Sequence, residues 1–172
     1  MKYLICIVTT LFISFDIAAQ DDSNDFNPLD FWEGQWILKN TSIDPEPDNQ
    51  LWKSELGLNE FIPILNGKGL HRIAKSGTQK NEAYMFFDKA SGKVYSFSID
   101  PNGYVWETSA SIKEDDDLIV FVGSAKNNPS LSTQSVLTIL NENEVTFVQT
   151  ILKSGKTIMT YKGLWLRIPN LK

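Results

Sequence analysis

His71 is the first side chain to consider for chemistry, because it is the only histidine in the sequence. Period-two alternation in its segment puts His71 and Ile73 on one face of a strand and Arg72 on the other. An imidazole that faces a cavity could donate to a ligand carboxylate, carry a proton or ligate haem. We favour a simpler interpretation, in which His71 is hydrogen-bonded to a neighbouring strand.

Aromatic residues alternate with other residues along two neighbouring segments. Tyr104 and Trp106 share one face of the second segment and Glu107 lies on the opposite face, while Phe97 on the first segment alternates with serines. Either face could line a cavity, and we expect the aromatic faces to point inward. Gln149 stands among apolar residues, where a buried amide must be satisfied by protein, water or ligand; we favour a cross-strand hydrogen bond.

The usual signatures of enzymes and metal sites are missing from the sequence. It contains no Gly-x-Ser-x-Gly, no His-Glu-x-x-His and no phosphate-cradling glycine loop. Residues 100–103 superficially suggest a calcium loop, but the ligands that should follow are absent, so we expect a hairpin turn. We therefore expect no catalytic residue, metal or cofactor. The candidate ligand-binding residues are His71, Tyr84, Phe97, Tyr104, Trp106, Gln149 and Tyr161.

The elements that must position these residues are strands, because period-two segments separated by turn residues run to the C-terminus and no stretch sustains a helical period. Gly, Pro and Asn in short connections indicate tight hairpins and hence antiparallel neighbours. The strands are expected at residues 35–43, 51–60, 69–75, 80–88, 93–100, 103–113, 118–124, 131–140, 145–152 and 157–168.

An up-and-down meander of this length protects its edges most simply by closing into a barrel of about eight to ten strands, and a two-sheet sandwich is the alternative. A short helical turn is expected at residues 27–34, where it could plug one end of the barrel. Residues 61–67 are apolar but contain Pro63, so we expect a turn or short helix over a barrel mouth there.

The N-terminus has the outline of a secretory signal peptide at residues 1–19, with Lys2 before an apolar run and small residues at its end. A polar linker at residues 20–26 and one β-barrel domain at residues 27–172 complete the expected organisation, with a retained membrane anchor as the weaker alternative. The only cysteine, Cys6, falls within the predicted signal, so the exported protein needs no disulfide. A net charge of −5 argues against binding nucleic acid.

Two short motifs resemble those of lipocalin-like proteins in the calycin superfamily. Gly34-Gln35-Trp36 is similar to the Gly-x-Trp signature that begins the first strand, and Arg167 matches the arginine that lies across the signature tryptophan from the last strand. The middle of the chain is similar to uncharacterised bacterial exported proteins of this kind. The resemblance implies a lipocalin-like barrel in which Gly34, Trp36 and Arg167 have structural roles.

These patterns predict an exported periplasmic or extracellular protein that binds a small hydrophobic or amphipathic molecule in its barrel without catalysis. One alternative is an enzyme acting on a barrel-bound lipid-like substrate with His71 or Glu107 as acid or base. The other is an envelope module whose outer faces bind another protein. No transmembrane segment is expected after processing.

Overall fold

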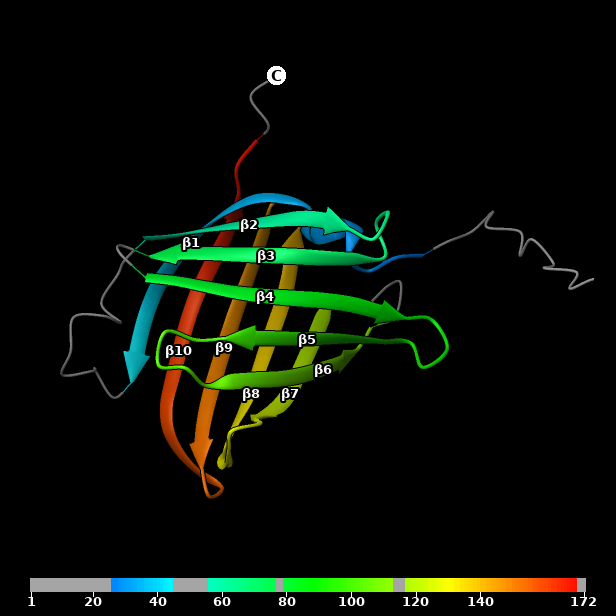
Figure 1. Ribbon diagram of the computed structural model, residues 1–172. Helices are drawn as coiled ribbons and strands as arrows, with labels where there is room; N and C mark the ends of the chain where they lie inside the picture. Colours follow the sequence, from blue (N-terminus) through cyan, green and yellow to red (C-terminus); the bar gives the residue numbers. More distant parts are fainter. Residues whose placement is uncertain (1–25, 45–55, 77–78, 113–116, 170–172) are drawn as a thin grey trace, which may run out of the picture.

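A computed structural model of the protein describes residues 26–44, 56–76, 79–112 and 117–169. In this part of the chain, ten antiparallel strands follow one another around a closed barrel, and β1 pairs with β10 to complete it (Figure 1). The all-β meander and its closure are thus confirmed. The predicted signal peptide and the predicted linker, except for Phe26, lie outside the described residues, as does the first part of the strand expected at residues 51–60.

The element bounds follow the predicted strands closely. A 3-10 turn, η1 (Asp30–Trp32), precedes the barrel and lies in the predicted helical turn. The strands are β1 (Gly34–Asp44), β2 (Leu56–Ile64), β3 (Gly69–Ser76), β4 (Gln79–Asp88), β5 (Lys93–Ile99), β6 (Val105–Ser111), β7 (Leu118–Ala125), β8 (Asn128–Asn141), β9 (Glu144–Lys153) and β10 (Lys156–Arg167).

Where the connection between consecutive strands lies wholly within the described residues, it is a short turn that fixes their antiparallel pairing. Between β9 and β10 the chain reverses at Ser154 and Gly155, whose φ angles of 50° and 78° give the left-handed conformation that two-residue hairpins require. Gly163 serves a different purpose, because a Cβ atom there would lie 2.3 Å from Cε1 of Phe147 on β9. The absence of a side chain at Gly163 therefore leaves room for the Phe147 ring.

The prediction for residues 61–67 is wrong in part, because β2 continues through Pro63 and pairs it with Leu70 of β3. The ladder between β1 and β2 ends at the pair Gly34 and Phe61, so Pro63 has no partner on the β1 side. Because no strand pairs with Pro63 on that side, its missing N–H group breaks no hydrogen bond to β1. Proline is tolerated at such an edge-like position. The expected turn begins only after Ile64.

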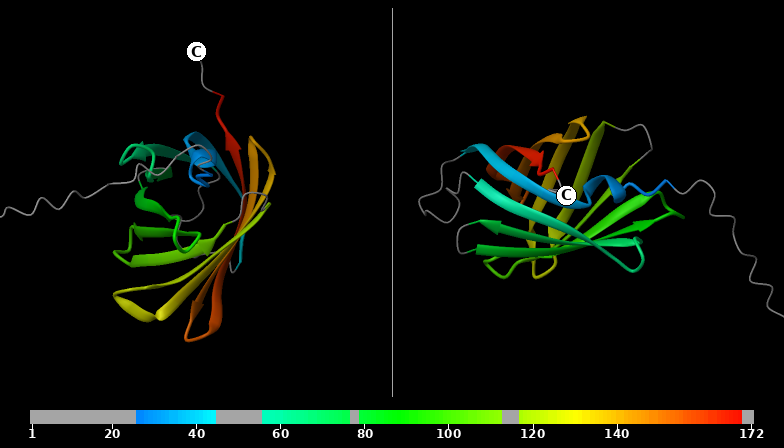
Figure 2. Two further views of the ribbon diagram at one scale, coloured as in Figure 1. Left: turned by 90° about the vertical axis from the view of Figure 1, so that its right-hand side faces the viewer. Right: turned by 90° about the horizontal axis from the view of Figure 1, so that it is seen from above.

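One end of the barrel is closed by an aromatic cluster. Trp32, from the 3-10 turn, lies 5.6 Å from Trp36, 5.8 Å from Phe61 and 5.9 Å from Trp165, measured between ring centroids. Asn27 ties this segment to the β2–β3 turn through a hydrogen bond from Nδ2 to the carbonyl of Gly67, at 3.0 Å. The turn containing Trp32 is seen near the end of β2 and the start of β3 in Figure 1, and from two further sides in Figure 2. The aromatic cluster thus fills the barrel at this end.

Candidate functional site

A cavity of about 360 Å³ lies inside the barrel, between the aromatic cluster and the loop that joins β5 to β6. Trp32, Phe61 and Trp165 form its wall at the closed end, and Asp100 and Pro101 border it at the loop. The barrel interior is therefore not filled by side chains. Its volume is in the range of about 300–1,000 Å³ that small-molecule sites occupy.

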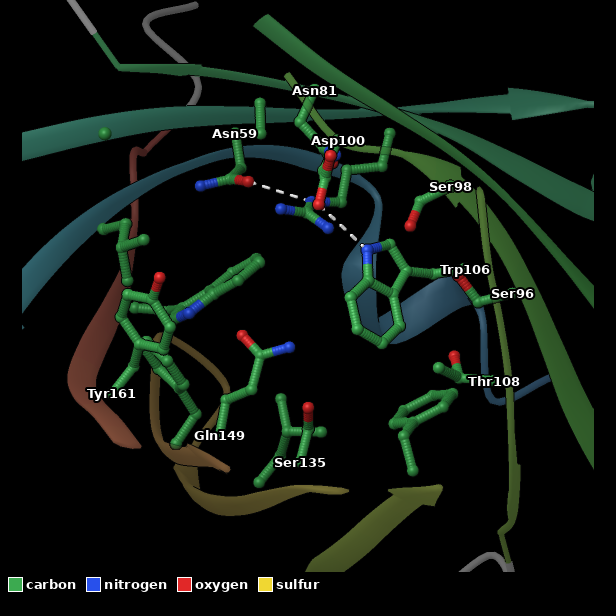
Figure 3. Close-up of a pocket in the computed structure, with 18 of the residues that line it drawn as sticks. Asn59, Asn81, Ser96, Ser98, Asp100, Trp106, Thr108, Ser135, Gln149 and Tyr161 are labelled. Atoms are coloured by element: carbon green, nitrogen blue, oxygen red, sulfur yellow. Dashed lines mark hydrogen bonds between the residues drawn. The ribbon is translucent and has the colours of Figure 1, made fainter. Parts of the chain in front are cut away.

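The cavity wall is mixed in chemistry. Its remaining apolar side chains are Leu38, Ala74, Met85, Trp106, Phe121, Leu137, Phe147 and Ile151. Its uncharged polar side chains are Asn59, Asn81, Ser96, Ser98, Thr108, Ser135, Gln149 and Tyr161, as Figure 3 shows. Such a wall suits a molecule that is apolar over most of its surface and polar at a few points.

Arg72 is the most deeply placed charge in this wall. Its Nε donates to Oδ1 of Asn59 at 3.0 Å, and its Cζ lies 5.5 Å from the ring centroid of Trp165. Burial lowers the pKa of Arg72 from 12.5 to about 10, because the guanidinium ion is held away from water. No carboxylate among the described residues forms an ion pair with it.

Asp100, the carboxylate of the wall, accepts hydrogen bonds from its own loop and from Trp106 on β6. Its Oδ2 accepts from Nε1 of Trp106 at 3.0 Å, and its Oδ1 accepts from the backbone N–H groups of Asn102 and Tyr104 at 2.8 and 3.0 Å. The same segment forms the hairpin turn expected at residues 100–103. These bonds orient the Trp106 indole along the cavity wall (Figure 3).

Gln149 and Tyr161 face each other across the β9–β10 ladder, and both line the cavity. Gln149 Nε2 donates to Oγ1 of Thr133 on β8 at 3.2 Å, which is the cross-strand bond that the sequence favours. Burial, followed by the nearby charge of Asp100, raises the pKa of Tyr161 well above its usual value of 10. This phenol therefore stays neutral in the folded barrel at physiological pH.

Three candidate residues lie on the outer face of the barrel. His71 Nε2 is 3.0 Å from Oε2 of Glu82, and the His71 ring stacks on Tyr84 with centroids 4.6 Å apart. Tyr84 and Phe97 are 44% and 42% exposed and pair with each other in the β4–β5 ladder. This outward row places His71, Tyr84 and Phe97 away from the cavity.

The expectation that the aromatic faces point inward is therefore right for Trp106 on β6 and wrong for Phe97 on β5. Trp106 enters the cavity from β6, and its cross-strand partner on β5 is Ser98. A large indole on one strand leaves space only for small side chains beside it on the next. Phe97 accordingly faces outward, and Tyr104 packs on Trp106 with centroids 6.3 Å apart without lining the cavity.

Glu107, the second acid or base candidate, is also outside the cavity. It forms an ion pair with Nζ of Lys126 on the outer side of the barrel. His71 and Glu107 therefore have no access to a molecule in the cavity. Within the described ranges, no cluster of three or more His, Cys, Asp or Glu side chains could hold a metal ion.

The sequence-based candidates omit Arg72, Asn59 and Asp100. The available signal was the alternation on β3, where Arg72 shares a face with the apolar residues Leu70 and Ala74. A charge on the apolar face of a strand marks either a buried ion or a strand turned the other way.

The chain is an antiparallel, closed β-barrel with an internal cavity. No protein-family model matches it, and a search of curated proteins gives no match. It is similar to a solved structure described as "Structure of EF1p2_mFAP2b bound to DFHBI", with 11% identity, coverage of 81% of this chain and 95% of that chain, and a TM-score of 0.36. No helix in the described ranges is both long and apolar enough to span a bilayer.

Proposed function

We propose that this protein binds a small amphipathic molecule inside its barrel and does not transform it. The observation that carries the proposal is the cavity of about 360 Å³, enclosed by a complete ring of strands and lined by apolar and hydrogen-bonding side chains. Preformed concave sites of this composition are the usual sites for small ligands. The apolar wall supplies affinity and the polar groups orient the molecule.

The positions of the two acid or base candidates support a noncatalytic role. A general acid or base must come within hydrogen-bond reach of its substrate. His71 is instead engaged with Glu82 and Tyr84 on the outer face, and Glu107 with Lys126. A molecule in the cavity is separated from both by the sheet.

The proposal includes a lipocalin-like relationship and export from the cytoplasm. The support for the relationship is the pairing of Trp36 with Arg167 between the first and last strands, together with Gly34 at the start of β1. The support for export is the signal-like composition of residues 1–19. Expression of the full chain in a bacterium, followed by N-terminal sequencing of the periplasmic fraction, tests export; a chain that keeps residues 1–19 in the cytoplasm contradicts it.

Uptake of N-phenyl-1-naphthylamine, an uncharged dye that fluoresces in apolar surroundings, tests binding. We expect saturable fluorescence with the wild-type protein and its loss in Ser98→Phe, which places a ring inside the cavity. Ser109→Phe is the matched control, because Ser109 lies on the outer side of β6. Absence of uptake by the wild type, or equal uptake by both variants, overturns the proposal.

A further inference from the structure

The cavity wall carries an excess of positive charge in a protein whose net charge is −5. Its charged side chains are Arg72, Lys75 and Asp100. Lys75 is exposed, while Asp100 accepts two hydrogen bonds from its own loop and one from Trp106 on β6. Arg72 therefore remains as the interior charge that forms no ion pair with a described side chain.

The guanidinium of Arg72 is held in a defined orientation but is only partly used. Its Nε donates to Asn59, which is 1% exposed, and its plane lies near the Trp165 ring. The hydrogen bonds between described residues leave its two terminal nitrogens without an acceptor. These two nitrogens form the side of the guanidinium that binds carboxylates in a bidentate manner.

Trp165 supplies a second, independent observation. It is 9% exposed, it lines the cavity, and its Nε1 has no hydrogen-bond acceptor among the described residues. Buried indole N–H groups are normally paired. The same part of the cavity thus contains two donors, on Arg72 and Trp165, that lack a described acceptor.

We propose that the molecule bound in the barrel is an organic acid, whose carboxylate pairs with Arg72 while its apolar body lies against the cavity wall. This inference rests on the proposed function, because it names the ligand class of the same cavity. An ionised carboxylate supplies the missing opposite charge and acceptor atoms together. Trp165 Nε1 is a further donor available to the same acid group.

Calorimetric titration with decanoate and decan-1-ol, both below their aggregation concentrations, tests the proposal. The two ligands share an apolar chain and differ in the charged group. Because hydrogen bonds to charged groups are stronger than those between neutral groups, we expect decanoate to bind about ten- to a hundredfold more tightly. Equal affinities, or tighter binding of the alcohol, overturn the assignment to acids.

Arg72→Gln removes the charge but keeps an amide donor for Asn59, and we expect it to bring decanoate affinity down to that of the alcohol. Lys126→Gln is the matched control, because it removes one positive charge from the outer side of the barrel, where Lys126 pairs with Glu107. We expect its preference for decanoate to remain within threefold of wild type. An unchanged preference in Arg72→Gln, or equal losses in both variants, overturns the role of Arg72.

The dye separates this inference from the proposed function. If wild type and Arg72→Gln both take up N-phenyl-1-naphthylamine while acid and alcohol bind equally, the barrel binds small molecules but not acids in particular. If neither dye nor decanoate binds the wild type, both proposals fail. Should Arg72→Gln fail to fold, Trp165→Phe gives the second test, with an expected loss of several-fold in decanoate affinity and none in decan-1-ol affinity; equal effects on both ligands contradict the proposal.

Discussion

Trp36 and Arg167 lie directly opposite each other in the ladder between the first and last strands, with the guanidinium carbon 4.3 Å from the indole centroid. The Arg167 side chain also donates to the carbonyls of Phe31, Glu33 and Glu142. One side chain thus connects the strand that closes the barrel to the turn that plugs it. Trp36 itself is fully buried and donates from Nε1 to the carbonyl of Trp32 at 2.9 Å.

Arg167→Met is expected to destabilise the protein by about 2–3 kcal/mol, because it removes hydrogen bonds from a charged donor and a cation–π contact. Urea unfolding followed by tryptophan fluorescence measures the change. Arg167→Lys keeps the charge but loses the fork geometry, so it should recover only part of the loss. A change below about 0.5 kcal/mol in Arg167→Met, the range of ordinary surface substitutions, would show that this contact does not lock the barrel.

Unlike Arg167, Arg72 should lower the free energy of unfolding. Its lowered pKa means that the guanidinium, still charged at neutral pH, is less favourable in the folded state than in the unfolded chain. Replacing Arg72 and its partner together, as Asn59→Leu with Arg72→Met, removes a buried charge without leaving Asn59 unsatisfied. We expect this double variant to unfold at higher urea concentration, by about 1–3 kcal/mol, while losing the preference for decanoate. A less stable double variant would contradict this account of Arg72.

Because of Tyr161, we expect the free energy of unfolding to decrease at alkaline pH. Its pKa is raised in the folded state, so its contribution is fully present below the unfolded value of 10 and is lost as the pH rises toward the folded value. Tyr161→Phe should therefore lose less stability than wild type between pH 9 and pH 11, measured by urea unfolding. Tyr84→Phe, on an exposed ring, is the control and should behave as wild type. Equal losses in all three proteins would contradict the prediction.

Removing the outward acid or base candidates should leave ligand binding intact. His71→Ala and Glu107→Gln are each expected to keep dye and decanoate affinities within about twofold, because the sheet separates both side chains from the cavity. Fluorescence titration measures both ligands. A tenfold loss in either variant would indicate that its side chain reaches the bound molecule.

The sequence predicts the barrel well because strand periodicity and turn chemistry are local properties. The hairpin at Ser154 and Gly155, for example, is legible from two residues. The direction that each strand faces is harder, because β5 carries apolar or small residues on both faces. The register sets Ser98 beside Trp106, and both side chains line the cavity.

Two other departures from prediction have a tertiary cause. Pro63 fits within β2 because the ladder between β1 and β2 stops at Gly34 and Phe61, a fact of register that the sequence of β2 does not contain. Arg72 points into the cavity because it lies on the same face of β3 as Leu70, which is buried in the core. A charge on that face breaks the local pattern, and such breaks tend to mark functional positions.

Because the aromatic cluster blocks one end of the barrel, no molecule can pass through it from end to end. An incoming ligand cannot displace the bound one through the blocked end. The bound ligand must therefore dissociate before the second ligand binds. Exchange between two ligands should then proceed at a rate set by departure alone, with no acceleration as the competitor is made more concentrated. Stopped-flow displacement of the dye by increasing decanoate would measure that rate.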